Sequence, residues 1–177
     1  MPPRHVSPAE VADFKLGVDR DELALDSSDL VRAVDVALVS QSTRYVDIVT
    51  RELDRTLYDR TEFLDALQRV LLGSARARLR VLTQSIDRAV AYGHRLLDVA
   101  RRMPTYVDIR LQSAEFSQYN AAYLIADRIG YTYRDAANRF DGVACFNGRT
   151  RADRLTHEFE QMWLSARGHP DMRNFHL

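Results

Sequence analysis

The sequence predicts an α/β fold in which one mixed, mainly parallel sheet contains a hairpin and is flanked by helices on both faces. Three observations lead to this prediction. Segments with apolar residues at helical spacing alternate with short apolar runs. Several of these runs are apolar on both sides, as in strands that helices cover on each face. An apolar hairpin between residues 121 and 134 then interrupts the alternation.

The first segment differs from the rest of the chain. Residues 1–25 contain Pro2, Pro3 and Pro8 and mixed charges, without a sustained hydrophobic period. Such composition is typical of a loose terminal segment. We therefore expect residues 1–25 to be a flexible N-terminal arm and residues 26–177 to be a single α/β domain.

Helical and strand-like segments alternate from Ser27 onward, and Ser27 or Ser28 is expected to cap the first helix. Consecutive strand–helix–strand units favour parallel strands with right-handed crossovers. In order, we expect a helix over 27–41, a strand over 45–50, a helix over 63–71, a strand over 79–83, one long helix over 86–103 and a strand near a sheet edge over 106–111.

The second half of the domain begins with the hairpin. Its strands are expected over 121–126 and 131–134, with the turn at 127–130. A polar loop, a strand over 142–146 and a helix over 152–166 complete the prediction.

Composition limits the function classes. The chain has 177 residues and balanced charge, 25 basic against 25 acidic. No global field therefore attracts nucleic acid, and any such partner requires a local patch. No apolar run reaches about 18 residues, and the first 25 residues lack a signal-peptide stretch. We expect a cytoplasmic protein without a membrane partner.

No cofactor or metal site is expected either. The sequence lacks the glycine-rich phosphate loops and the paired histidines of a metalloprotease. Cys145 is the single cysteine, which excludes an internal disulfide. It is interpreted as a small core residue, with a reactive thiol as the alternative.

The hairpin, the strand after it and a final helix with Phe159 and Trp163 on one face resemble half of a phospholipase D-like domain. The resemblance covers about residues 28–167. That superfamily carries a His-x-Lys-x4-Asp (HKD) signature at the start of the hairpin. Aligning its aspartate with Asp127 puts Asn120 in place of the histidine and Ala122 in place of the lysine. The motif is therefore degenerate.

These replacements imply that the family's chemistry is lost. In that mechanism the histidine attacks phosphorus and the lysine neutralises phosphate oxygens. An asparagine amide has no basic nitrogen and alanine has no charge, so no catalytic residues are assigned. The resemblance further implies a homodimer. The predicted domain is also similar to degenerate bacterial domains found beside an acetyltransferase, and this similarity implies an acetyltransferase or another protein as a partner.

Candidate ligand-binding residues lie near the ends of the predicted strands. The polar segment 51–60 follows the carboxyl end of the first strand, where open α/β sheets usually bind ligands. His94 is interpreted as a surface or interface residue. The candidate set is Arg51, Asp54, Arg55, Asn120, Asp127 and Arg134.

Two hypotheses follow. In the first, the protein is a non-catalytic binding or regulatory module for an anionic ligand, a nucleic acid or a protein partner. In the second, it is a phosphodiesterase or another hydrolase with a rebuilt active site. A perturbed histidine or acid pair in the cleft would favour the enzyme, and a cleft without such a pair would favour the module.

Overall fold

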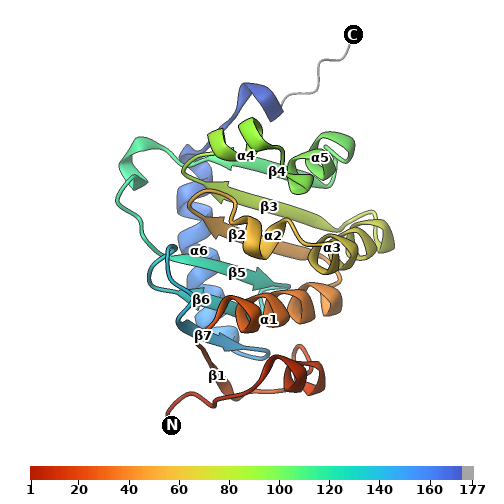
Figure 1. Ribbon diagram of the computed structural model, residues 1–177, viewed down its shortest axis with the longest axis vertical. Coiled ribbons are helices and arrows are strands. Elements are labelled where there is room, and N and C mark those ends of the chain that lie inside the picture. Colours follow the sequence, from red (N-terminus) through yellow and green to blue (C-terminus); the bar gives the residue numbers. More distant parts are fainter. Residues whose placement is uncertain (173–177) are drawn as a thin grey trace.

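The computed structural model describes residues 1–172 and contains one eight-stranded sheet with helices on both faces (Figure 1). The strands are β1 (Glu22–Leu25), β2 (Tyr45–Thr50), β3 (Arg78–Thr83), β4 (Val107–Leu111), β5 (Ala122–Ala126), β6 (Gly130–Arg134), β7 (Gly142–Cys145) and β8 (Arg167–Gly168). Their order across the sheet is β1-β7-β6-β5-β2-β3-β4-β8. The predicted α/β fold class is thereby confirmed.

The helices belong to two layers. They are α1 (Ser28–Gln41), α2 (Arg55–Tyr58), α3 (Thr61–Gly73), α4 (Asp87–Tyr92), α5 (Arg95–Arg102) and α6 (Arg149–Ser165), with short 3-10 turns η1 (Pro8–Asp13), η2 (Ala114–Phe116) and η3 (Pro170–Met172). In Figure 1, α6 crosses behind the sheet, whereas α1 to α5 lie in front of it. No helix of the described residues 1–172 is long and apolar enough to cross a membrane.

Alternation along the central strands explains why both faces are covered. Ile48 of β2 and Leu124 of β5 join the core beneath α1 and α3, whereas Val49 and Tyr123 join the core beneath α6. Asp47 is a polar exception on the α6 side, where Arg80 of β3 holds it in a 2.8 Å ion pair. The two-sided apolar pattern therefore predicted the central strands correctly.

Between the named strands of the described residues, parallel pairing is restricted to β2, β3 and β4. The other neighbouring strands pair antiparallel, so the sheet is less parallel than the sequence suggested. For β5, β6 and β7 the reason is local: no helix separates these strands in the chain, and short connections between neighbouring strands produce antiparallel pairs.

The N-terminal segment packs on the domain, and the expectation of a loose arm over residues 1–25 does not fit this packing. β1 pairs antiparallel with β7, with Leu23 opposite Ala144, and Leu23 is fully buried. Phe14 stacks on Phe146 with ring centroids 5.6 Å apart. Sequence reasoning missed this strand because it is short and its apolar partners lie far along the chain.

The long helix expected over 86–103 is instead two helices, α4 and α5. Gly93 separates them with a positive φ of 72°, a backbone conformation that glycine adopts without steric cost. The side chain of His94 then caps α5 by accepting a hydrogen bond from the backbone N–H of Leu96. The apolar spacing continued through this break, which is why one helix was predicted.

The β5–β6 turn is held by Asp127. Asp127 and Arg128 have positive φ values of 51° and 59°, as in the tight turns that match the twist of a hairpin. The Asp127 carboxylate accepts hydrogen bonds from the backbone N–H groups of Thr43, Arg44 and Tyr45 at 2.8 to 2.9 Å. The predicted turn role of Asp127 agrees with this geometry.

Candidate functional site

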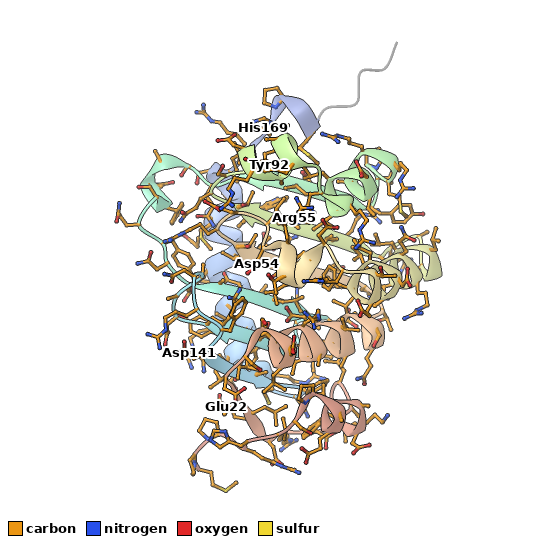
Figure 2. The ribbon with its side chains drawn as sticks, viewed as in Figure 1. Glu22, Asp54, Arg55, Tyr92, Asp141 and His169 are labelled. Atoms are coloured by element: carbon orange, nitrogen blue, oxygen red, sulfur yellow. The ribbon has the colours of Figure 1, made fainter. Side chains whose placement is uncertain are left out.

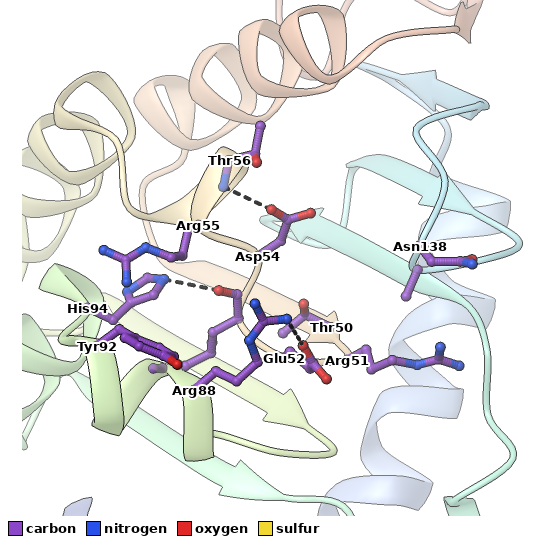
Figure 3. A pocket seen from close by; sticks show the side chains of 13 residues that line it. Thr50, Arg51, Glu52, Asp54, Arg55, Thr56, Arg88, Tyr92, His94 and Asn138 are labelled. Carbon is purple, nitrogen blue, oxygen red and sulfur yellow. Dashed lines mark hydrogen bonds and ion pairs between the residues drawn. The ribbon is translucent and has the colours of Figure 1, made fainter.

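A pocket of about 500 Å³ lies at the carboxyl end of β2, where the sequence predicted a cleft (Figure 3). We call it the β2 pocket. Its lining comes from the segment after β2, from α4 and the residue capping α5, and from the loop after β6. The lining residues are Thr50, Arg51, Glu52, Leu53, Asp54, Arg55, Thr56, Arg88, Ala89, Tyr92, His94, Ala137 and Asn138.

Arg51 and Asn120 come together beside this pocket. An Arg51 guanidinium nitrogen donates a 2.8 Å hydrogen bond to Asn120 Oδ1. Among residues 1–172 Arg51 has no ion-pair partner, because this acceptor is a neutral amide. The pairing brings two predicted site residues together and leaves the positive charge of Arg51 uncompensated.

Asp54 and Arg55 also line the pocket, and both side chains make contacts within the fold. Asp54 caps α2 by accepting a 2.9 Å hydrogen bond from the backbone N–H of Thr56. Arg55 donates to the carbonyl of Gly93 and forms a 3.1 Å ion pair with Asp59. In Figure 2 Asp54 and Arg55 lie near the middle of the face that carries α2.

Arg88 and Tyr92 of α4 form another wall. Arg88 pairs with Glu52 at 3.5 Å, and both side chains are largely solvent-exposed. Tyr92 is 74% exposed, which is unusual for a large aromatic side chain beside a pocket. Its ring is therefore available to a ligand.

His94 is not at the surface, contrary to our interpretation of the sequence. It is 3% exposed, and its Nδ1 accepts from the N–H of Leu96, so Nε2 donates to the carbonyl of Leu53, 3.1 Å away. Burial lowers the pKa of His94, and the nearby Arg55 and Arg95 act in the same direction, whereas Asp59 opposes them. This neutral ring uses both nitrogens for backbone bonds.

The backbone beside His94 is strained. Leu53 lines the pocket with a positive φ of 56°, a region that leucine rarely occupies. The hydrogen bond from His94 helps to hold it there. Strained residues of this kind persist only where surrounding contacts stabilise them, and they are often found at functional sites.

Arg134 and Asp127 lie outside the pocket lining. Arg134 is 3% exposed, and its Nη1 donates to the carbonyls of Ala137 and Arg139 at 3.2 and 2.7 Å. Asp127 directly follows β5, whereas Asn120 precedes it, so the two residues lie at opposite ends of this strand. The structure therefore gives both residues structural contacts, while their prediction as ligand-binding residues has no support in the pocket geometry.

Cys145 is buried at 4% exposure, as the core interpretation requires. Burial raises the pKa of its thiol, and the carboxylates of Glu22, Asp21 and Asp19 raise it further. The thiolate needed for a reactive cysteine is thus disfavoured.

The lining residues that sequence reasoning missed include Arg88, Tyr92 and Asn138. Arg88 and Tyr92 fell inside the long helix that was predicted, where nothing distinguished them from other solvent-facing positions. Asn138 lies in a loop that antiparallel pairing of β5 and β6 brings to the carboxyl end of β2. A correct break at Gly93 would have been the useful signal for the first two.

Solved structures with this architecture include TrmBL2, an archaeal chromatin protein, with a TM-score of 0.61 and 10% identity over 91% of this chain and 58% of that chain. NucT from Helicobacter pylori gives 0.57 and 9% over 85% of this chain and 98% of its own. Nuc from Salmonella typhimurium, a phospholipase D family member, gives 0.54 and 11% over 78% and 90%. At these identities the likeness concerns the fold alone.

The chain therefore has a phospholipase D-like fold. Residues 27–175 match the family described as Domain of unknown function (DUF7931), and the chain belongs to that family. No curated protein matches the sequence.

Proposed function

We propose that this protein is a non-catalytic phospholipase D-like module that binds a phosphate-bearing ligand in the β2 pocket. The observation that carries the proposal is the hydrogen bond between Arg51 and Asn120, which holds a guanidinium without neutralising it. A guanidinium offers several donors in a planar fork that suits phosphate oxygens. Asn120, which the alignment sets in place of the nucleophilic histidine of the motif, orients the guanidinium of Arg51 in this proposal.

The side chains of the pocket support a binding role over catalysis. Within the described residues, its lining has one histidine and no serine or cysteine. That histidine, His94, has a lowered pKa, the feature that would favour an enzyme, but both of its ring nitrogens are engaged in backbone bonds, so we assign it no role as a general base. Ala122, which occupies the lysine position of the motif, is fully buried.

The charge distribution supports an anionic ligand. Arg55 is paired with Asp59 and Arg88 with Glu52, whereas Arg51 has a neutral partner. One carboxylate oxygen of Asp54 accepts the hydrogen bond from the backbone N–H of Thr56 that caps α2. The exposed ring of Tyr92 adds a surface on which a planar group, such as a nucleobase, can stack.

Isothermal titration with bis(4-nitrophenyl) phosphate tests this proposal. Replacing Arg51 by Gln removes one charge-assisted hydrogen bond, so the affinity is expected to fall about tenfold. The matched control is Arg69→Gln, because Arg69 is an exposed residue of α3 outside the pocket lining. Equal affinity of the wild type and Arg51→Gln, or no saturable binding, would overturn the proposal.

Association with other chains is a separate part of the proposal. The resemblance to phospholipase D-like domains suggests a homodimer, and its similarity to domains beside an acetyltransferase suggests such a protein as partner. Light scattering on the purified chain, alone and with added acetyltransferase domain, checks both. A monomer in each sample would contradict them.

A further inference from the structure

A group of buried polar side chains lies beneath α1 and next to the β2 pocket. Asp35 of α1 is 1% exposed, and its Oδ1 lies 2.7 Å from the hydroxyl of Thr132, which donates to it. Its Oδ2 has no hydrogen-bond partner among the described residues. A carboxylate buried with a single hydrogen bond is costly to ionise. Burial accordingly raises the pKa of Asp35 to about 7, although Thr132 and Arg134 favour the charged form.

Arg134 connects this group to one wall of the pocket. Its Nη1 binds the carbonyls of Ala137 and Arg139, both in the segment 135–141, which we call the β6–β7 loop. Ala137 lines the pocket, and its N–H donates a 2.8 Å hydrogen bond to the backbone carbonyl of Asn120. The loop therefore joins Arg134 to the residue that orients Arg51.

The neighbouring elements supply few other charges. At the start of α2, Asp54 disfavours the ionised form of Asp35. Tyr58 of α2 is 1% exposed, and burial together with Asp35 raises its pKa above the ordinary tyrosine value, although the charge of Arg134 and a hydrogen bond from it act in the opposite direction. The buried residues of α3 and those of β5 are apolar, apart from the hydroxyl of Tyr123 on the opposite face. Arg134 is thus the cation whose charge acts on Asp35.

We propose that Asp35 and Arg134 form a proton-controlled latch on the β6–β7 loop. When Asp35 is neutral, the guanidinium of Arg134 is held by the two loop carbonyls, as in this structure. When Asp35 releases its proton to solvent, its carboxylate attracts Arg134 and weakens those two bonds. The loop is therefore fastened at lower pH and loosened at higher pH.

The effect on ligand binding rests on the proposed function of the β2 pocket. Because Ala137 and Asn138 belong to the pocket wall, a ligand that contacts the fastened loop binds better when Asp35 is neutral. By linkage, the same ligand raises the pKa of Asp35 when it binds.

Amide NMR spectra of the ligand-free full chain test the latch directly, from about pH 5 to about pH 8.5, around the titration range of Asp35. The loop amides of residues 136–141 are expected to shift with one midpoint, shared with the Asp35 carboxyl carbon. Asp35→Asn is expected to abolish this transition, while Asp65→Asn, an exposed aspartate on α3, leaves it intact. Loop amides that do not titrate, or that titrate equally in Asp35→Asn, would overturn the proposal.

A second variant keeps the test decisive if Asp35→Asn does not fold. Thr132→Val removes the hydrogen bond that favours the ionised carboxylate, so the loop midpoint is expected to move to higher pH. An unchanged midpoint in Thr132→Val would contradict the latch.

Titrations with bis(4-nitrophenyl) phosphate over the same pH range separate the two proposals, since the charge of this diester is constant there. The affinity of the wild type is expected to fall with rising pH, and that of Asp35→Asn to stay constant. A loop that titrates with Asp35 without any diester binding would overturn the proposed function and leave the latch standing. Binding with no pH dependence and no loop transition would do the reverse.

Discussion

Arg51 donates a 2.8 Å hydrogen bond to Asn120, a residue 69 positions further along the chain. The antiparallel pairing of β2 and β5 makes this contact, because the residue after β2 and the residues before β5 meet at one sheet edge. The same geometry puts Asn120, which we propose to stand in place of the motif histidine, next to a guanidinium.

The first prediction concerns the charge at position 120. Asn120→Asp gives Arg51 a carboxylate partner, so affinity for inorganic phosphate is expected to fall about tenfold. The free energy of unfolding is expected to change by less than about 1 kcal/mol, because the pair is exposed. Calorimetric titration and urea denaturation measure the two quantities. Unchanged phosphate affinity would show that Arg51 does not contact the ligand.

The second prediction separates a planar group from a phosphate. Tyr92→Ala removes an exposed ring, so the binding of AMP is expected to weaken. We expect its free energy of binding to become less favourable by about 1 kcal/mol or more, the range measured for base stacking. Affinity for inorganic phosphate is expected to be unchanged, and it serves as the internal control. Equal loss for both ligands would indicate that the substitution disturbs the pocket as a whole.

The third prediction concerns Asp127 at the opposite sheet edge. Asp127→Ala removes the acceptor of three backbone N–H groups and of the Thr43 hydroxyl, so we expect a loss of about 2–4 kcal/mol in the free energy of unfolding. Asp127→Asn keeps a side-chain oxygen and tolerates the positive φ, and is expected to cost less. Neither variant should alter phosphate affinity. A weakened affinity in Asp127→Asn would return this residue to the binding site.

The fourth prediction is a pH dependence of stability. The pKa of Asp35 is about 7 in the folded protein against an ordinary 3.8, so between these values the folded chain holds a proton that the unfolded chain has lost. Its contribution to the free energy of unfolding therefore decreases as pH rises through this window, by at most about 1.4 kcal/mol per pH unit. Above the folded-state pKa the contribution is constant.

Urea denaturation of the wild type and Asp35→Asn at several pH values measures this contribution. The difference between the two proteins removes groups common to both, including Asp47, whose pKa is also raised by burial. We expect the difference to change with pH in the direction given above. A difference that is constant with pH would mean that Asp35 does not carry a raised pKa.

The sequence was sufficient for the fold class and for most central strands. Runs such as residues 45–50 are apolar on both sides, and this pattern depends on burial alone, which is local information. β1 was missed because a strand of four residues at a sheet edge has little pattern of its own. Its place in the sheet depends on β7, more than a hundred residues later.

Three of the six candidate residues lie in the lining of the β2 pocket. Arg51, Asp54 and Arg55 follow a buried strand, and that topological rule placed them in the pocket. The rule could not show that the side chain of Arg134 donates hydrogen bonds to loop carbonyls, because this depends on side-chain contacts. Asp35 carried an overlooked signal: it shares the apolar stripe of α1 with Val31 and Leu38, where a charged residue is out of place.

The most direct test of the central claim follows binding and hydrolysis of bis(4-nitrophenyl) phosphate in the same samples of wild type and Asn120→Asp. We expect saturable binding to the wild type, weaker binding to the variant, and no release of nitrophenolate above buffer from either. Release by the wild type that Asn120→Asp abolishes would show that the degenerate motif still catalyses phosphodiester cleavage, and would contradict the proposed non-catalytic function.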